Sequence, residues 1–277
     1  MGKAAQWTLM LLLGGCAGQP PLATHAPPAP QPIQPTDSQV NIDPLTRARI
    51  DALLALRNSQ PALNNGQRIA LISQQFLDTP YLAKMLIGSA SNAEQLTIDF
   101  RAVDCFTLLD YVEALRNAED YPQFIHRLTT VRYVNAEIGF LTRKHFFSDW
   151  SQPPHASVKD ISAQLSPHAV TLNKTLNRKA DGSQYLPGLP NVTHAISYIP
   201  SGYVNDHLLS QLRTGDYIGI YSNLPGLDVS HVGIYLMTPS GPVLRNASSR
   251  EHNRRVVDSP FIDYVVATPG IVVLRPL

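Results

Sequence analysis

The spacing of apolar residues changes along the chain between the period of a helix and the period of a strand. At positions 105–115 the apolar residues recur every three or four positions, which places them on one helix face: Cys105, Leu108, Leu109, Val112 and Leu115. Just before them, residues 96–101 alternate apolar and polar side chains, which predicts a strand. A strand therefore leads through a turn into a helix, and Cys105 lies on the first turn of that helix.

Three further helices are predicted around this unit. Asp43 followed by Pro44 is typical of an N-cap and a first helical position, and the helical spacing continues to about residue 57. A second helix is predicted over 67–77 and another over 121–132. Helices therefore dominate the first half of the chain.

The C-terminal part is richer in strands. Short apolar segments separated by turn residues predict strands at 217–221, 232–237, 243–247, 256–257 and 270–274. Helices first and an antiparallel sheet last indicate an α+β domain. Between the two parts we expect a long insertion at about 133–207. Its stretch from 153 to 207 is rich in Pro, Asn and Ser, and we expect it to be irregular with short elements.

The N-terminus resembles a bacterial lipoprotein signal peptide over residues 1–15. Lys3 precedes an apolar run at 7–13 that is too short to span a bilayer as a helix. The sequence Leu13-Gly14-Gly15-Cys16 is similar to a lipobox, which implies cleavage before Cys16 and lipid attachment to its sulfur. An ordinary secretory signal, or an apolar N-terminus with a chance cysteine, is the alternative. Ala17 resembles the sorting pattern of outer-membrane lipoproteins, so we expect a periplasm-facing protein anchored there.

Residues 16–42 form the next segment and are rich in Pro, Ala and Gln. This composition predicts an extended tether, because it offers too little apolar surface for a core. At ~3 Å per residue such a tether could hold a domain tens of ångströms from the membrane. We expect the folded domain over residues 43–277.

The charge balance excludes one class of partner. The formal net charge is +1, from 22 basic and 21 acidic residues, and no basic block interrupts the sequence. Proteins that bind nucleic acid carry a concentrated positive surface, which this composition does not predict. No group of His, Cys, Asp and Glu has the tight spacing of a metal site, and no cofactor is implied.

Cysteine usage makes Cys105 the best candidate for a nucleophile. The chain has two cysteines, and lipidation would consume Cys16, which leaves one thiol in an oxidising compartment. At a helix start, free backbone N–H groups and the helix dipole favour a thiolate and suit the oxyanion of an acyl-transfer intermediate. The alternative is an inert cysteine on an apolar helix face.

A cysteine hydrolase also needs a base beside the thiol and a polar group that orients the base. Among nine histidines, His231 is the best placed, because it directly precedes a predicted strand. Symmetric pairing about the expected hairpin tip places it opposite about Arg250, on the same face as Asn246 and Ser248. We prefer Asn246, whose amide oxygen can accept the imidazole N–H. His145 is the second candidate base, and a strand-end histidine without catalytic role is the alternative for His231.

A cluster of aromatic and charged residues follows the helix predicted at 121–132. Its members are Arg132, Tyr133, Arg143, His145, Phe146, Phe147, Asp149 and Trp150. Aromatic rings beside Arg and His suit a cleft that binds sugar or peptide. A buried structural network explains the same composition equally well.

Several ordered motifs resemble the NlpC/p60 superfamily of papain-like cell-wall cysteine peptidases. They are Asp-Cys at a helix start, Pro80-Tyr81 ahead of it, Gly215-Asp216 before an apolar strand, and Ser230-His231-Val232-Gly233-Ile234-Tyr235 followed by Asn246-Ala247-Ser248. The closer similarity is to the N-acetylmuramoyl-L-alanine amidase-like branch, through Asp104-Cys105-Phe106-Thr107, Arg132-Tyr133, Arg143-Lys144-His145, Asp149-Trp150 and Gly226-Leu227-Asp228-Val229-Ser230-His231. The resemblance extends from about Gly66 to the C-terminus.

The resemblance implies a role for each matching position. Cys105 corresponds to the nucleophile, His231 to the base and Asn246 to the third, orienting residue. Positions implied to bind substrate are Tyr81, which matches a tyrosine near the thiolate, and Asp104, Arg143, His145, Trp150, Asp228 and Ser230. Two departures stand out, since Phe106-Thr107 replace a common Ser-Gly pair and the third position is often histidine.

The resemblance also implies a papain-like α+β fold and a periplasmic activity. The expected reaction is hydrolysis of peptidoglycan or muropeptides at the amide between N-acetylmuramic acid and L-alanine. Cleavage between D-glutamate and diaminopimelate is the alternative enzyme activity. The alternative of another class is a non-catalytic lipoprotein that binds the cell wall.

Overall fold

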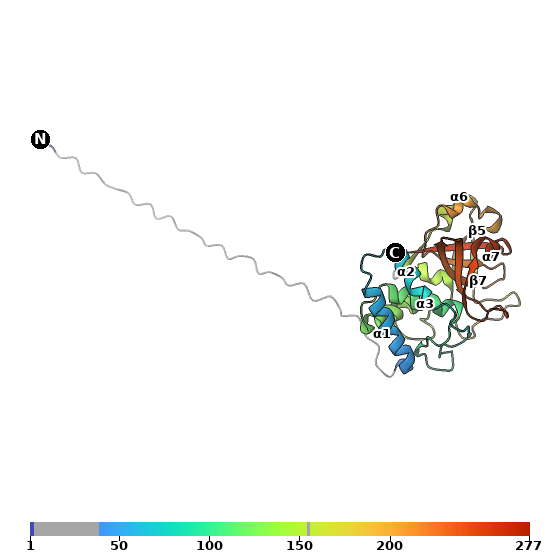
Figure 1. Cartoon of the computed structure of the whole chain (residues 1–277), viewed down its shortest axis with the longest axis horizontal. Helices are drawn as coiled ribbons and strands as arrows, with labels where there is room; N and C mark the ends of the chain where they lie inside the picture. The colour runs from blue at the N-terminus through green and yellow to red at the C-terminus, as the bar shows by residue number, and fades with distance from the viewer. Residues whose placement is uncertain (3–38, 154–155) are drawn as a thin grey trace. The chain divides into compact units, whose positions relative to one another are not determined.

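The computed structural model describes residues 1–2, 39–153 and 156–277 (Figure 1). The helices and strands below belong to a compact unit formed by residues 33–277. The expected signal peptide, Cys16 and nearly all of the expected tether lie outside the described residues. In the part of the chain that is described, no helix is long and apolar enough to cross a membrane.

The longer helices all come from the first half of this unit. They are α1 (Pro44–Asn58), α2 (Asn65–Gln74), α3 (Cys105–Arg116) and α4 (Tyr121–Arg132). The carboxylate of Asp43 accepts the N–H groups of Leu45 and Thr46, so the predicted N-cap of α1 is confirmed. The predicted bounds of α4 are confirmed as well, whereas α2 begins and ends slightly earlier than its apolar spacing indicates.

The strands of the second half form one antiparallel sheet. They are β3 (Val158–Asp160), β4 (Val170–Leu176), β5 (Val192–Pro200), β6 (Tyr217–Tyr221), β7 (Val229–Thr238), β8 (Gly241–Ala247), β9 (Val256–Pro260) and β10 (Gly270–Pro276). The strand order is β4-β5-β10-β6-β7-β8-β9, and β3 also pairs with β10. A separate parallel pair joins β1 (Val40–Ile42) to β2 (Leu96–Ile98). The expected α+β architecture with an antiparallel sheet is what the structure shows.

Both faces of the central strands are buried. Along β10, Val272 and Leu274 pack into the core shared with α1–α4, while Ile271 and Val273 pack into a second cluster. The second cluster includes residues of three short helices, α5 (Ser162–Leu165), α6 (Asp206–Leu209) and α7 (Phe261–Val266). Among the described residues lie three further short 3₁₀ helices, η2 (Val134–Ala136), η3 (Phe147–Ser151) and η4 (Ser201–Tyr203). Burial on both faces explains why these strands are apolar runs rather than strict alternations.

The stretch expected to be irregular contains two long strands, so that expectation is wrong. β4 and β5 pair from Val170 opposite Tyr198 to Leu176 opposite Val192, and β5 continues the main sheet through β10. Most residues of β4 are exposed, and only Lys174 and Leu176 are buried. A strand that buries so few side chains leaves no clear alternation in the sequence.

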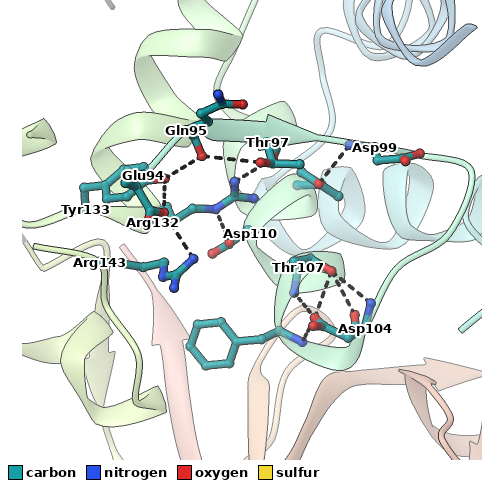
Figure 2. A network of polar contacts seen from close by, with 12 residues as sticks. Glu94, Gln95, Thr97, Asp99, Asp104, Thr107, Asp110, Arg132, Tyr133 and Arg143 are labelled. Carbon is teal, nitrogen blue, oxygen red and sulfur yellow. Dashed lines mark hydrogen bonds and ion pairs between the residues drawn. The ribbon is translucent and has the colours of Figure 1, made fainter. Parts of the chain in front are cut away.

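A buried polar network connects β2 and the segment before it to α3 and α4 (Figure 2). Arg132 Nε donates to Asp110 Oδ2 over 2.7 Å, and Arg132 Nη1 donates to the carbonyl of Thr97 over 2.7 Å. Arg143 lies 3.1 Å from the carboxylate of Glu94, which also accepts the hydroxyl of Tyr133 over 2.9 Å. Of the two explanations for the aromatic and charged cluster, the buried network therefore holds for its arginines and its tyrosine.

Candidate active site

Cys105 is the first residue of α3, and the residue before it caps the helix. Asp104 accepts the N–H groups of Phe106 and Thr107 over 3.1 and 2.7 Å. Thr107 Oγ1 in turn accepts the N–H of Asp104 over 2.9 Å, which completes a reciprocal capping box (Figure 2). The cap fixes where the helix begins and so fixes the position of the thiol. The carboxylate of Asp104 is engaged in this cap rather than in the cavity, so the expectation of direct substrate contact is corrected for Asp104.

Burial decides the protonation of the Cys105 thiol. Burial and the nearby Asp104 carboxylate raise its pKa to about 12, although the N–H groups of Val232, Cys105 and Phe106 act in the opposite direction. The thiol therefore rests mostly protonated at neutral pH, because the N–H groups at the helix start, which favour a thiolate as expected, only partly offset burial and the Asp104 charge. Helix polarity can be inferred from sequence, but the loss of solvent around the sulfur cannot.

His231 and Asn246 form the hydrogen-bonded pair that the sequence predicts. His231 Nε2 lies 3.0 Å from Asn246 Oδ1. The amide nitrogen of Asn246 donates to the carbonyl of Leu244 over 3.0 Å and to Ser259 Oγ over 3.2 Å. Because that nitrogen faces a carbonyl, the oxygen of Asn246 must face the imidazole, and His231 must carry its proton on Nε2. Nδ1 of His231 then carries a lone pair that can accept a proton.

The register of the hairpin that carries this pair differs from the predicted one. Thr238 is opposite Gly241 and Ile234 is opposite Arg245, so the tip is Pro239-Ser240, one residue earlier than symmetric pairing about Ser240 and Gly241 implies. Continued at the same register, His231 falls opposite Ser248 rather than Arg250. A shift of two residues does not change which side chains share a face, so Asn246 still lies on the same face of the sheet as His231.

Cys105 and His231 line the same cavity, of about 250 Å³. The sulfur also accepts the backbone N–H of Val232, the residue that follows His231. Most of the cavity wall is apolar, contributed by Phe106, Phe146, Phe147, Tyr185, Leu186, Leu227, Val229 and Val232, and the polar residues beside the pair are His145, Asp228 and Ser230. The cavity therefore brings a thiol, an imidazole and room for a substrate together.

Of the remaining residues that the resemblance implies, Tyr81, Asp228 and Ser230 lie close to this pair. Tyr81 forms a parallel β-bridge with Val103. The pKa of the Tyr81 phenol is raised mainly by burial, and a negative charge on Cys105 would raise it as well. Asp228 is buried and accepts the N–H groups of Ser148 and Val229, each over 2.7 Å. Ser230 is exposed at a bulge between β6 and β7. Asp228 thus shapes the wall, while Ser230 is open to a ligand.

His145 also lines the cavity, but its partner is a backbone carbonyl rather than the side chain of an asparagine. Its Nε2 lies 2.8 Å from the carbonyl oxygen of Phe140, to which it donates, and its ring packs edge-on against the Phe140 ring. Burial lowers the pKa of His145 to about 4, so the ring is neutral at neutral pH. A neutral histidine bound to a carbonyl is suited to contact a substrate and to shape the wall.

Two residues implied to bind substrate lie elsewhere. Trp150 is 0% exposed and packs edge-on against Phe106 and Tyr217, with ring centroids 5.7 and 5.5 Å apart. Arg143 is engaged with Glu94 in the buried network. Neither side chain lines the cavity, so the expectation of direct substrate contact is corrected for both. Trp150 instead packs against Phe106, which follows Cys105 and lines the cavity, so Trp150 supports the cavity wall from within the core.

Tyr264 belongs to the site, and sequence reasoning missed it. Its ring stacks on that of His231, with centroids 6.1 Å apart and planes 25° apart. Burial raises the pKa of Tyr264 and the charge of Arg250 lowers it, while ionisation of Cys105 to a thiolate would raise it. Tyr264 lies on the short helix α7, whose sequence shows no helical spacing of apolar residues that would predict it.

The site shows no sign of a metal centre. In residues 1–2, 39–153 and 156–277, no group of three or more His, Cys, Asp and Glu side chains could hold an ion. A larger cavity, of about 650 Å³, lies at the start of α2 beside Arg213, Asp216 and Arg275. It contains neither a thiol nor an imidazole, so the candidate catalytic residues belong to the smaller cavity.

Comparison with known proteins supports an amidase-like assignment. A family model described as N-acetylmuramoyl-L-alanine amidase-like matches residues 71–271. No curated protein sequence matches the chain significantly.

Three crystal structures resemble the fold. A protein from Legionella pneumophila is 22% identical, with 84% of this chain and 96% of that chain covered and a TM-score of 0.70. An N-acetylmuramoyl-L-alanine amidase from Bacteroides uniformis is 27% identical, with coverages of 76% and 98% and a TM-score of 0.65. A protein from Bacteroides fragilis described as a candidate xylanase is also 27% identical, with coverages of 73% and 98% and a TM-score of 0.59. These structures are similar over nearly their whole length.

Proposed function

Because this chain belongs to the N-acetylmuramoyl-L-alanine amidase-like family, we propose that it is a cysteine amidase acting on peptidoglycan or its fragments. The bond we propose is the amide between N-acetylmuramic acid and L-alanine, by analogy with the amidase from Bacteroides uniformis. One observation carries the cysteine mechanism: Cys105 lies at a helix start, in the same cavity as a histidine whose far nitrogen is bound to Asn246. We also assign the fold to the papain-like NlpC/p60 superfamily, on the order of its motifs.

The proposed reaction starts from a neutral pair. The Cys105 thiol passes its proton to His231 Nδ1 as the sulfur attacks the amide carbonyl, and Asn246 stabilises the imidazolium through Nε2–H. The backbone N–H groups at the start of α3 suit the oxyanion of the tetrahedral intermediate. His231 then protonates the leaving amine as the C–N bond breaks, which leaves a thioester on Cys105. Water, deprotonated by His231, hydrolyses the thioester and restores the thiol.

Two other functions are testable against this one. The same cysteine chemistry would serve cleavage between D-glutamate and diaminopimelate. The Bacteroides fragilis structure, described as a candidate xylanase, suggests glycosidase activity as another function. Most glycosidases use two accessible carboxylates on either side of the glycosidic bond. The cavity is lined by the carboxylate of Asp228, which is buried, and the nearby Asp149 is half-buried; both accept backbone N–H groups. This arrangement favours the amidase.

The experiment is digestion of defined muropeptides with product identification by mass. Free stem peptide beginning with L-alanine supports the proposed bond, whereas released diaminopimelate supports the endopeptidase and free sugar supports a glycosidase. Cys105→Ser is the control, and product formation by that variant would exclude the thiol mechanism. Binding to cell wall without any product would favour the non-catalytic alternative.

We further propose that the mature protein is anchored by a lipid on Cys16 and faces the periplasm from the outer membrane. The sequence Leu13-Gly14-Gly15-Cys16 and the composition of residues 16–42 support this proposal. Replacement Cys16→Ser should move the protein from the membrane fraction to the soluble fraction. Retention in the membrane fraction would contradict a lipid anchor.

A further inference from the structure

The connection between β8 and β9 places two arginines over tyrosine rings. The guanidinium carbon of Arg250 lies 4.5 Å from the ring centroid of Tyr264, and that of Arg254 lies 5.4 Å from the ring centroid of Tyr81. Both arginines are exposed. Arg250 also forms a hydrogen bond with the Tyr264 side chain. Stacking on an aromatic face holds a guanidinium in place and leaves its remaining N–H groups available to another partner.

Both tyrosines belong to the surroundings of the nucleophile. Tyr264 stacks on His231, and Tyr81 forms a bridge with Val103, two positions before Cys105. A charged thiolate at Cys105 raises the pKa of each phenol. The two arginines are therefore held at the site, each by a different tyrosine.

The connection itself has a fixed shape. Ser248 Oγ accepts the N–H of Arg250 over 3.3 Å and an amide hydrogen of Asn253 over 3.4 Å. The N–H of Arg254 donates to the carbonyl of Arg250 over 3.0 Å, and Arg254 adopts a φ of 46°. A non-glycine residue in the left-handed region carries a conformational cost that functional loops often retain.

These two guanidiniums differ from their neighbours in charge pairing. Arg255 lies 3.3 Å from Asp78, and Arg245 lies 2.7 Å from Asp258. Across the described ranges, no carboxylate lies within ion-pair distance of Arg250 or Arg254. The guanidinium groups of Arg250 and Arg254 have no anionic partner within these ranges and lie near the candidate nucleophile. They are therefore suited to bind a carboxylate of a substrate.

We propose that Arg250 and Arg254 bind a carboxylate of the substrate next to the amide that Cys105 attacks. This inference rests on the proposed function and adds a substrate class to it, namely acidic peptides or peptide-bearing sugars. The cavity offers an apolar wall, and its lining includes neither arginine. Apolar and anionic parts of the substrate would thus be recognised by different walls of the site.

The first test uses two alkylating reagents that differ in charge. Iodoacetate carries a carboxylate and iodoacetamide does not, while both transfer the same two-carbon unit to sulfur with loss of iodide and the thiol proton. In protein carrying Cys16→Ser, the ratio of the two alkylation rates at Cys105 should fall about threefold to tenfold in Arg250→Gln and in Arg254→Gln. Arg250→Lys and Arg254→Lys should restore most of the ratio.

Arg255→Gln is the matched control, because it removes the same charge from the same connection but from a guanidinium that already has a partner. Its ratio should stay unchanged. If iodoacetamide labels Cys105 in all variants and the ratio does not fall in either glutamine variant, the carboxylate site is wrong and the amidase proposal stands. If iodoacetamide labels Cys105 in none of them, the thiol is inert and the proposed function falls together with this inference.

The second test identifies which carboxylate is bound. Muropeptides are compared with analogues in which either the D-glutamyl α-carboxylate or the terminal carboxylate is amidated. Amidation of the recognised group should raise KM in the unmodified protein but not in Arg250→Gln or Arg254→Gln. Equal KM values for all three substrates in the unmodified protein would overturn the proposal.

Discussion

His231 Nε2 lies 3.0 Å from Asn246 Oδ1, and this contact spans two neighbouring strands, β7 and β8. Asn246 is 0% exposed, and both hydrogens of its amide group have acceptors, Leu244 and Ser259. The orientation of the asparagine is therefore determined by its surroundings, and it determines which nitrogen of His231 carries the proton. A single amide thus sets both the tilt and the tautomer of the candidate base.

Asn246→Ala should lower kcat by roughly 10²-fold, because a base released from its orienting contact is misplaced relative to the thiol. KM should change much less, since Asn246 does not line the cavity. Steady-state kinetics on one muropeptide measures both values. The matched control is Ser259→Ala, which removes one partner of the amide nitrogen but leaves Leu244 in place. A larger loss in the control than in Asn246→Ala would contradict the orienting role.

Cys105→Ser should reduce kcat by roughly 10⁴-fold, because a serine hydroxyl is far harder to ionise than a thiol. The fold should remain intact, since the cap formed by Asp104 and Thr107 does not involve the sulfur. Turnover and thermal unfolding of the variant give the two readouts. Residual turnover close to that of the unmodified protein would exclude Cys105 as the nucleophile.

The two histidines of the cavity should respond differently to removal. His231→Ala should nearly abolish kcat, while His145→Ala should raise KM a few-fold and leave most of kcat, because His145 donates to the carbonyl of Phe140. Both variants are compared on the same muropeptide. If His145→Ala loses turnover while His231→Ala retains it, the roles must be exchanged.

Local periodicity made the four longer helices, α1 to α4, predictable from sequence, and a strand-to-helix turn identified Cys105 as the nucleophile candidate. The hairpin of β4 and β5 could not be recognised, because strands with exposed faces leave little pattern. Tyr264, Arg250 and Arg254 could not be predicted to lie at the site. Their contacts join residues far apart in sequence, across a short helix and an irregular connection.

The protonation of Cys105 shows the same limit. Its position at a helix start is visible in the sequence, and that position alone predicts a stabilised thiolate. Burial and the charge of Asp104 depend on the whole fold, and together they outweigh the backbone N–H groups. The helix start is thus visible in the sequence, whereas the resting charge of the Cys105 thiol depends on the whole fold.

A neutral thiol gives a distinct pH profile. Since burial raises the pKa of Cys105 to about 12, alkylation by iodoacetamide should accelerate about tenfold per pH unit between pH 6 and pH 9, following the thiolate fraction. Asp104→Asn should speed the reaction at each pH, because asparagine can still cap the helix while the negative charge is lost. Absorbance of the thiolate near 240 nm gives an independent measurement. A rate that is flat over this range would indicate a preformed thiolate–imidazolium pair instead.

Asp149 should make the stability of the protein depend on pH. Burial raises the pKa of Asp149 to about 7, with a further rise from Asp228, while its Oδ2 accepts the N–H of Phe146 over 2.9 Å. Lys144 acts in the opposite direction, and His194 lies 3.8 Å away. The folded protein therefore binds a proton between about pH 4 and pH 7 that the unfolded chain releases, so this contribution to stability declines as pH rises through that window.

Asp149→Asn tests this directly, because asparagine can still accept the N–H of Phe146 without carrying a charge. The variant should gain stability relative to the unmodified protein at pH 8, by at most about 4 kcal/mol, and gain much less at pH 5. Thermal unfolding at the two pH values measures the difference. The control is Asp51→Asn, which removes an exposed carboxylate paired with Arg47. An equal effect of Asp149→Asn at both pH values would show that the carboxyl of Asp149 does not titrate between them.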